Sequence, residues 1–215
     1  MKPADFIETL STAKFANVFN PYSDKCDKCD QDNAPQTRSE TLLAMLEAAI
    51  ESEVDSMWIG RDLGFRGGRR TGLALTDDIN LQVHANRWRV PVNRPTSGDP
   101  VAERTATFIW RVLSLISQPV FLWNVFPLHP HEPGNPFTNR SHNSIERKFG
   151  EKALIQLVRL LNPLRLVAIG KDAALTLKKL DISCVAVRHP SYGGQTMFLE
   201  QINNLYNFPS ACAPM

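Results

Sequence analysis

A recurring pattern of strand, loop and helix is the feature that most constrains the fold of this chain. Short apolar segments expected to form strands lie at residues 57–59, 120–123, 166–169 and 184–187. Capping residues and helical apolar spacing predict helices at residues 39–50, 99–117, 141–161 and 172–180. Such alternation favours parallel strands with helices on both faces. The sequence therefore predicts an α/β fold of three layers, α/β/α, around a central, mostly parallel four-stranded sheet.

The length and composition suit one hydrophobic core. The chain has 215 residues, of which 43% are hydrophobic, and a single α/β domain can occupy that length. We expect one domain over residues 1–215, with residues 1–35 as an irregular N-terminal strap. The N-terminus lacks the basic start and apolar run of a signal peptide, and no segment approaches about 18 uninterrupted apolar residues. We therefore expect a soluble, cytoplasmic monomer that does not contact a membrane.

A loop rich in glycine and arginine follows the first expected strand. Residues 58–78 read WIGRDLGFRGGRRTGLALTDD, which matches neither a Walker loop nor a GxGxxG fingerprint. Glycines let backbone amides approach an anion and arginines add charge, so the loop could hold a phosphate; the alternative is a solvated turn. The formal net charge is only +2, so a polyanion would need a local patch. The best candidates for that patch are Arg61, Arg66, Arg69 and Arg70.

Cys26 and Cys29 form a CxxC pair within a polar segment. Such a pair could donate two ligands to zinc or iron, but a structural site needs further ligands. The other cysteines, Cys184 and Cys212, show no second CxxC spacing. The preferred interpretation is an exposed polar loop with two thiols, and we expect no metal and no cofactor.

Polar side chains follow three of the expected strands. Asp62 comes after the first, Asn124 after the second and His189 after the last. Each has an ordinary structural explanation alone: a capped turn, a satisfied buried backbone group or a hydrogen-bonded core histidine. Ligands of parallel α/β sheets gather at the carboxyl ends of the strands. The joint occurrence of these residues at equivalent positions therefore favours a functional site.

Several motifs in order resemble the uracil-DNA glycosylase superfamily. They are GRDLG at 60–64, TGLAL at 71–75, FLWNVFPLHPH at 121–131, SHNSIERKFG at 141–150, VAIGKDAA at 167–174 and RHPSYGG at 188–194. The resemblance covers roughly residues 57–200. It implies a DNA repair glycosylase that flips uracil out of single- or double-stranded DNA, hydrolyses its N-glycosidic bond and leaves an abasic site.

The resemblance also implies roles for individual residues. Asp62 would stabilise the oxocarbenium-like sugar and hold the attacking water, and His189 would donate to O2 of the departing base. Asn124 would pair with O4 and the N3 hydrogen of uracil. Ser191 and the backbone around Gly193 would hold a DNA phosphate beside the flipped nucleotide.

This chain departs from the pattern of the superfamily at several positions. Leu75 stands where an aromatic ring usually stacks on the base, and Phe65 could supply the ring instead. Gly64 stands where a tyrosine excludes thymine in the best-known uracil enzymes. Gly193 stands at the usual wedge position, so Tyr192 or a residue of the arginine loop would fill the gap in the duplex.

The remaining expectations concern DNA contacts and alternatives. Arg66, Arg69 and Arg70 are expected to bind DNA, and Leu128 in the loop after Asn124 argues against an iron–sulfur cluster. One alternative is a glycosylase for another deaminated or mismatched base. The other is a DNA-binding module of the same fold that has lost turnover.

Overall fold

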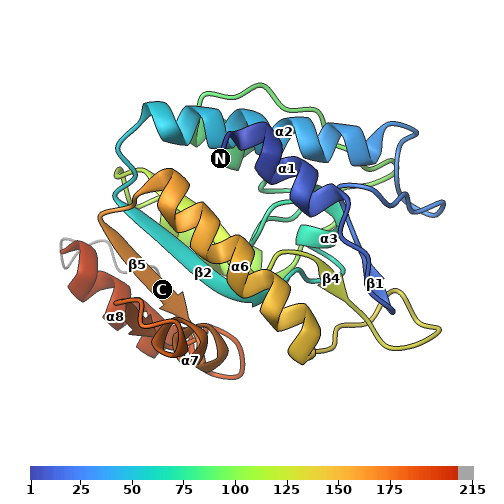
Figure 1. Cartoon of the computed structure of the whole chain (residues 1–215). Coiled ribbons are helices and arrows are strands. Elements are labelled where there is room, and N and C mark those ends of the chain that lie inside the picture. The colour runs from blue at the N-terminus through green and yellow to red at the C-terminus, as the bar shows by residue number, and fades with distance from the viewer. Residues whose placement is uncertain (208–215) are drawn as a thin grey trace.

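A parallel sheet of four strands forms the centre of the structure, a computed structural model that describes residues 1–207 (Figure 1). The strands are β2 (Ser56–Asp62), β3 (Val120–Phe126), β5 (Arg165–Ile169) and β6 (Val185–Val187). They lie in the order β3-β2-β5-β6, and all their pairings are parallel. Each expected strand overlaps one of them, so the predicted parallel sheet is confirmed.

Helices cover both faces of the sheet and complete the predicted three layers. One face is covered by α1 (Pro3–Ser11), α2 (Ala34–Glu51), α6 (Ser144–Leu161) and α7 (Lys171–Lys179). The other is covered by α5 (Arg104–Leu113) and α8 (Gln195–Tyr206). Met57 and Ile59 of β2 pack into the first core and Trp58 into the second, because successive side chains of a strand alternate between faces. In Figure 1, α1 runs alongside α2.

The N-terminal segment is more regular than expected. The prediction of an irregular strap over residues 1–35 is wrong for Pro3–Ser11, because these residues form α1, which buries Phe6, Ile7 and Leu10 against the sheet layer. A short strand β1 (Val18–Phe19) also pairs antiparallel with β4 (His129–Pro130). The next helix, α2, already begins at Ala34, since a proline in the first turn suits a helix start.

Two other helices begin later than expected because different residues cap them. The Glu103 side chain accepts hydrogen bonds from the backbone N–H groups of Thr105 and Ala106, at 3.2 and 3.1 Å, so α5 begins at Arg104. Asn143 and Glu146 form a reciprocal capping box, so α6 begins at Ser144. Two short helices, α3 (Gly68–Thr71) and α4 (Leu81–Arg87), lie between β2 and α5. Within residues 1–207, no helix is long and apolar enough to span a membrane.

The strand order leaves one edge of the sheet suited to a ligand. The chain passes from β2 to its neighbour β3 by way of α5 on one face, and from β3 back to β5 by way of α6 on the other. The connection that leaves β2 therefore turns to one face of the sheet, and the connection that returns to β5 runs over the opposite face. In open α/β sheets this switch point, at the carboxyl ends of the strands, is where ligands bind.

Candidate active site

Asp62, Asn124 and His189 all lie toward the carboxyl edge of the sheet. Asp62 is the last residue of β2, and Asn124 of β3 is the register partner of Gly60. His189 follows β6 and lies against the end of β5, since a Cβ on Gly170 would come within 3.1 Å of the His189 Cβ. The three strands thus bring the three predicted side chains to one edge.

Asn124 is the most informative residue of this edge. It is only 1% exposed, yet neither Nδ2 nor Oδ1 of its amide has a hydrogen-bond partner within the described chain. Buried polar groups are nearly always paired, and an unpaired one costs roughly 1–3 kcal/mol. The amide lies over Gly60, where any Cβ would collide with Oδ1. The fold therefore keeps the Asn124 donor and acceptor available to a bound ligand.

Asp62 is held on both sides by cationic or histidine side chains. Its Oδ2 accepts a hydrogen bond from Arg61 Nε at 2.6 Å, and its Oδ1 accepts one from His142 Nδ1. The Asp62 side chain is only 6% exposed and that of His142 only 1%. Each carboxylate oxygen has further lone pairs, so one lateral hydrogen bond apiece leaves Asp62 able to accept from a water.

The tautomer of His142 follows from its second contact. Arg147 Nε donates to His142 Nε2 at 3.1 Å, so this ring nitrogen must be an acceptor. The ring proton is therefore assigned to Nδ1, which donates it to Asp62. A neutral His142 orients the carboxylate without cancelling its charge. Sequence reasoning missed His142 and Arg147, because a histidine before a helix cap carries no signal of its tertiary partner.

His189 is arranged as a neutral hydrogen-bond donor. The backbone N–H of Ser191 donates to His189 Nδ1 at 3.1 Å, which leaves the proton on Nε2. Burial lowers the pKa of His189, and the positive charges of Arg61 and Arg188 lower it further. The Nε2–H group is therefore available as a donor at neutral pH.

Leu75 lies in the same region as Asn124, and the backbone of Phe65 is tied to the loop before α6. A Cβ on Gly60 would come within 3.4 Å of Leu75 Cδ2, so the leucine side chain lines the space above the free amide. Leu75 has a φ of +54°, which is rare for a residue with a branched side chain. The backbone N–H of Phe65 donates to Asn139 in the loop before α6, at 2.9 Å. Around Gly64, a Cβ would meet nothing within 4 Å.

The arginine loop is largely buried, which contradicts one expectation. Arg69 and Arg70 are only 3% and 8% exposed, so they do not form the exposed phosphate-binding patch that was predicted. Arg70 pairs with the buried Asp78 at 2.6 Å, and the Arg69 guanidinium lies 4.0 Å from the centre of the Phe19 ring. By contrast, Arg66 is exposed and donates to the Ala102 carbonyl at 3.3 Å.

The loop after His189 presents an aromatic ring to solvent. Tyr192 is 99% exposed, and both it and Gly193 have positive φ values of +51° and +74°. The Ser191 hydroxyl lies 3.5 Å from that of Thr105 at the start of α5. A strained backbone that holds a large ring away from the protein suggests a contact with a partner.

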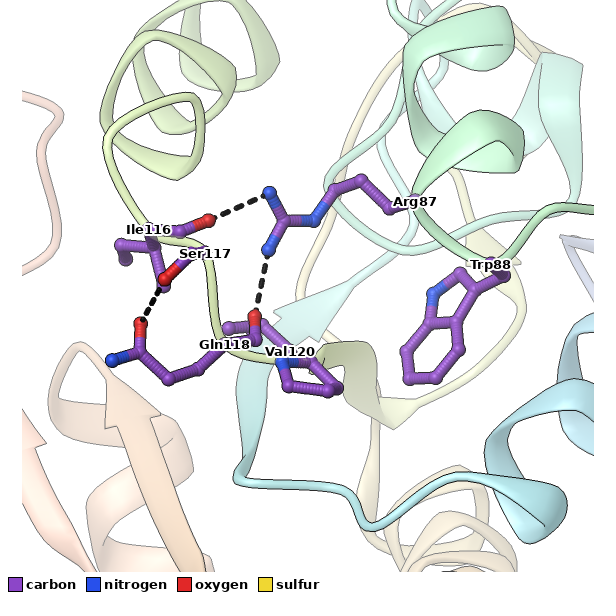
Figure 2. A pocket seen from close by; sticks show the side chains of 7 residues that line it. Arg87, Trp88, Ile116, Ser117, Gln118 and Val120 are labelled. Carbon is purple, nitrogen blue, oxygen red and sulfur yellow. Dashed lines mark hydrogen bonds between the residues drawn. The ribbon is translucent and has the colours of Figure 1, made fainter.

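A cavity of about 150 Å³ lies elsewhere, beside the start of β3 (Figure 2). Arg87 fills one side of it and donates to the carbonyl oxygens of Ile116 and Gln118 at 2.9 and 2.8 Å. These contacts tie the turn after α5 to α4, which is a structural task. Because Val120 begins β3, this cavity is at the opposite edge of the sheet from Asn124.

Comparisons with known proteins give a family match and a fold match. The sequence profile of the family described as "Uracil DNA glycosylase superfamily" matches residues 50–206, well over half of the chain. Among solved structures, the crystal structure of wild-type Pedobacter heparinus SMUG2 is similar, with a TM-score of 0.61. The match covers 96% of this chain and 97% of that one at 16% sequence identity. At that identity the likeness concerns the fold alone. The comparison with curated proteins gives no match.

Proposed function

Because this chain belongs to the uracil DNA glycosylase superfamily, we propose that it is a DNA repair enzyme that hydrolyses the N-glycosidic bond of uracil in DNA. The observation that carries the proposal is the buried Asn124 amide with both polar atoms free. Its Nδ2 can donate to O4 of uracil, and its Oδ1 can accept from the N3 hydrogen. A flipped uracil would thus satisfy both atoms at once.

The other groups at this edge suit the charges that develop as the bond breaks. Cleavage leaves a cation on the sugar and an anion on the base. Asp62, whose charge the neutral His142 preserves, would face the sugar and hold the attacking water. His189, with its proton on Nε2, would donate to O2 of the departing base. Leu75 would pack on the face of the base, with less stacking than an aromatic ring provides.

Replacing Asn124 by Leu should separate a functional role from a structural one. Leucine has a similar volume and no polar atoms, so the free energy of unfolding should rise by about 1–3 kcal/mol. Release of uracil under single-turnover conditions should fall at least about 100-fold, because base recognition is lost. Thr176→Val in α7 is a matched control, since the buried Thr176 hydroxyl also lacks a hydrogen-bond partner among residues 1–207. If Thr176→Val stabilises the protein and Asn124→Leu still releases uracil, Asn124 is a core residue that does not recognise the base.

We propose that His142 positions Asp62. Replacing His142 by Phe removes the donor to Asp62 while it keeps a ring in the same space. The single-turnover rate should fall about 10- to 100-fold, because a carboxylate free to rotate holds the water less well. The dissociation constant for DNA should not change. His142→Gln, which keeps a donor, should restore part of the rate, whereas equal rates for both variants would exclude a positioning role.

We propose that Tyr192 fills the gap left in the duplex by the flipped base. Its ring is fully exposed and rises from the loop that also carries His189. Tyr192→Ala should slow uracil release from duplex DNA about tenfold or more, given the worth of stacking on a base. Release from single-stranded DNA, where no gap needs filling, should be little affected. Equal losses on both substrates would argue for a different role.

A second candidate substrate is a base with a larger group at C5. The open space at Gly64 supports this candidate, because the resemblance assigns thymine exclusion to that position. Gly64→Tyr would then narrow the substrate range toward uracil. The test compares thymine release with uracil release for the wild-type protein and for Gly64→Tyr.

A further inference from the structure

Several polar and loop segments around the arginine loop are more buried than the sequence suggested. Cys26 is only 7% exposed, so the interpretation of an exposed loop with two thiols is wrong for this residue. Residues 71–78, at the end of the arginine loop, are all buried except Leu75, which is half-buried. The Leu75 side chain lies beside Gly60, over which the free amide of Asn124 also lies. Leu75 is therefore the residue of this segment that a ligand at the Asn124 amide can reach.

Side chains hold the backbone of Leu75 in an unfavourable conformation. Its φ of +54° is rare for a residue with a branched side chain. Three successive carbonyl oxygens accept hydrogen bonds from side chains: that of Ala74 from Thr76 Oγ1 at 2.9 Å, that of Leu75 from Trp110 Nε1 at 3.0 Å, and that of Thr76 from Thr71 Oγ1 at 2.8 Å. Strained residues persist only where their surroundings determine the conformation, and they cluster at ligand sites.

Trp110, in α5, is itself fixed by its neighbours. It is only 4% exposed, and its ring packs on that of His84 with the ring centres 4.9 Å apart. Thr76 Oγ1 gives its one proton to the Ala74 carbonyl, so the proton between Thr76 and His84 is assigned to His84 Nδ1, 2.9 Å from Oγ1. Burial lowers the pKa of His84 to about 3, so the ring that supports Trp110 stays neutral at physiological pH.

We propose that Trp110 is a positioning residue for base recognition, whose hydrogen bond to the Leu75 carbonyl holds the leucine side chain against one face of the flipped base. This inference rests on the proposed glycosylase function and deepens it. The Asn124 amide pairs with the polar edge of the base, whereas Leu75 packs on its face. Dispersion contacts weaken steeply across a gap of less than about 1 Å. A leucine in place of an aromatic ring therefore depends on accurate placement.

The test measures how much the base itself contributes to DNA binding. The probes are two duplex oligonucleotides of one sequence, with 2′-fluoro-2′-deoxyuridine or a tetrahydrofuran abasic analogue at the same position. The fluorine disfavours a cation on the sugar, so the base stays attached during the measurement. The ratio of the two dissociation constants, here called the base preference, reports the contacts made by the flipped base.

Trp110→Phe keeps a ring against His84 and removes the donor to the Leu75 carbonyl. The base preference should fall about three- to tenfold, as for the loss of one hydrogen bond, while the affinity for abasic DNA stays the same. Leu75→Ala should lower the base preference about tenfold, because apolar contact area is lost. In the Leu75→Ala background, Trp110→Phe should have no further effect, because the tryptophan acts through Leu75.

Trp88→Phe is the matched control for the loss of an indole N–H. Trp88 is 6% exposed, and its Nε1 has no hydrogen-bond partner among residues 1–207. It lines the cavity beside the start of β3, at the opposite edge of the sheet from Asn124 (Figure 2). Trp88→Phe should therefore leave the base preference unchanged.

Three results for Trp110→Phe would overturn the proposal: an unchanged base preference, an equal loss of affinity for both oligonucleotides, or a loss that adds to that of Leu75→Ala. Thr76→Val disturbs the same turn by removing the hydroxyl that donates to the Ala74 carbonyl. If Trp110→Phe fails to fold, a lower base preference in Thr76→Val supports the proposal and an unchanged one overturns it. Release of uracil by the unsubstituted protein, together with an unchanged base preference in the variants, would refute the positioning role alone. Failure of the unsubstituted protein to release uracil would refute the glycosylase function itself.

Discussion

Asp62→Asn is expected to lower the single-turnover rate of base release by about 10²- to 10³-fold, with DNA binding retained. A carboxylate close to the sugar stabilises the developing cation, and the amide that replaces it carries no charge. The low exposure of the Asp62 side chain keeps solvent from screening that interaction. The amide also changes the hydrogen bond with His142, since its NH₂ group cannot accept from Nδ1.

The control for this variant is Asp172→Asn. Asp172 also lies beside Arg61, at 3.5 Å, but it is about half exposed and lies in the first turn of α7. Its replacement should change the rate little, because an exposed ion pair contributes little. If Asp62→Asn cleaves at nearly the wild-type rate, Asp62 does not act on the sugar or the water.

Two other acids near the arginine loop are already engaged in structural contacts. Asp77 is fully buried and accepts hydrogen bonds from the backbone N–H groups of Asn80 and Glu103, at 2.9 and 2.6 Å. Asp78 pairs with Arg70 and accepts from the Thr96 hydroxyl at 2.9 Å. Variants of either should lose stability, because buried N–H groups or a buried cation would lose their partner. This distribution of contacts favours Asp62 as the acid that acts on the substrate.

His189→Ala is expected to reduce the single-turnover rate by about 10²-fold or more while DNA still binds. The variant removes the Nε2–H donor that would stabilise the departing base anion, and loss of one such donor typically has an effect of this size. The measurement is rapid quench of base release, with DNA affinity determined in parallel. An unchanged rate would remove His189 from the reaction.

The protonation of His189 should also determine how the single-turnover rate depends on pH. Because burial and the charges of Arg61 and Arg188 lower the pKa of His189, the ring should stay neutral at pH 7 and take up a proton only below about 6.5. A protonated ring cannot accept from the Ser191 N–H, so the rate should fall on the acid side alone. Arg188→Gln removes one of the lowering charges and should move that fall to higher pH. A profile that does not respond to Arg188 would show that another group controls it.

The architecture and the family could be predicted from sequence because both depend on local patterns. Apolar strand segments such as 120–123 stay buried on both faces, and the strand ends that carry Asp62 and Asn124 follow from the parallel order. The motifs from GRDLG to RHPSYGG indicated the family, and the family match over residues 50–206 confirms it.

The features that could not be predicted depend on which side chains meet in space. Arg69 and Arg70 belong to a polar, glycine-rich segment, and only Phe19, Phe137 and Asp78, which bury them, distinguish them from surface arginines. His142 orients Asp62 across 80 positions of sequence. Periodicity and capping rules describe neighbours along the chain, so they contain no information on such pairs.

The most direct test of the central claim is release of free base by the purified protein from oligonucleotides with one uracil. Matched oligonucleotides would carry cytosine, or thymine opposite guanine, at the same position, in single- and double-stranded form. We expect free uracil and an abasic strand, with no release of cytosine. DNA that binds the protein but keeps its uracil intact would contradict the proposed glycosylase function and identify the chain as a binding module.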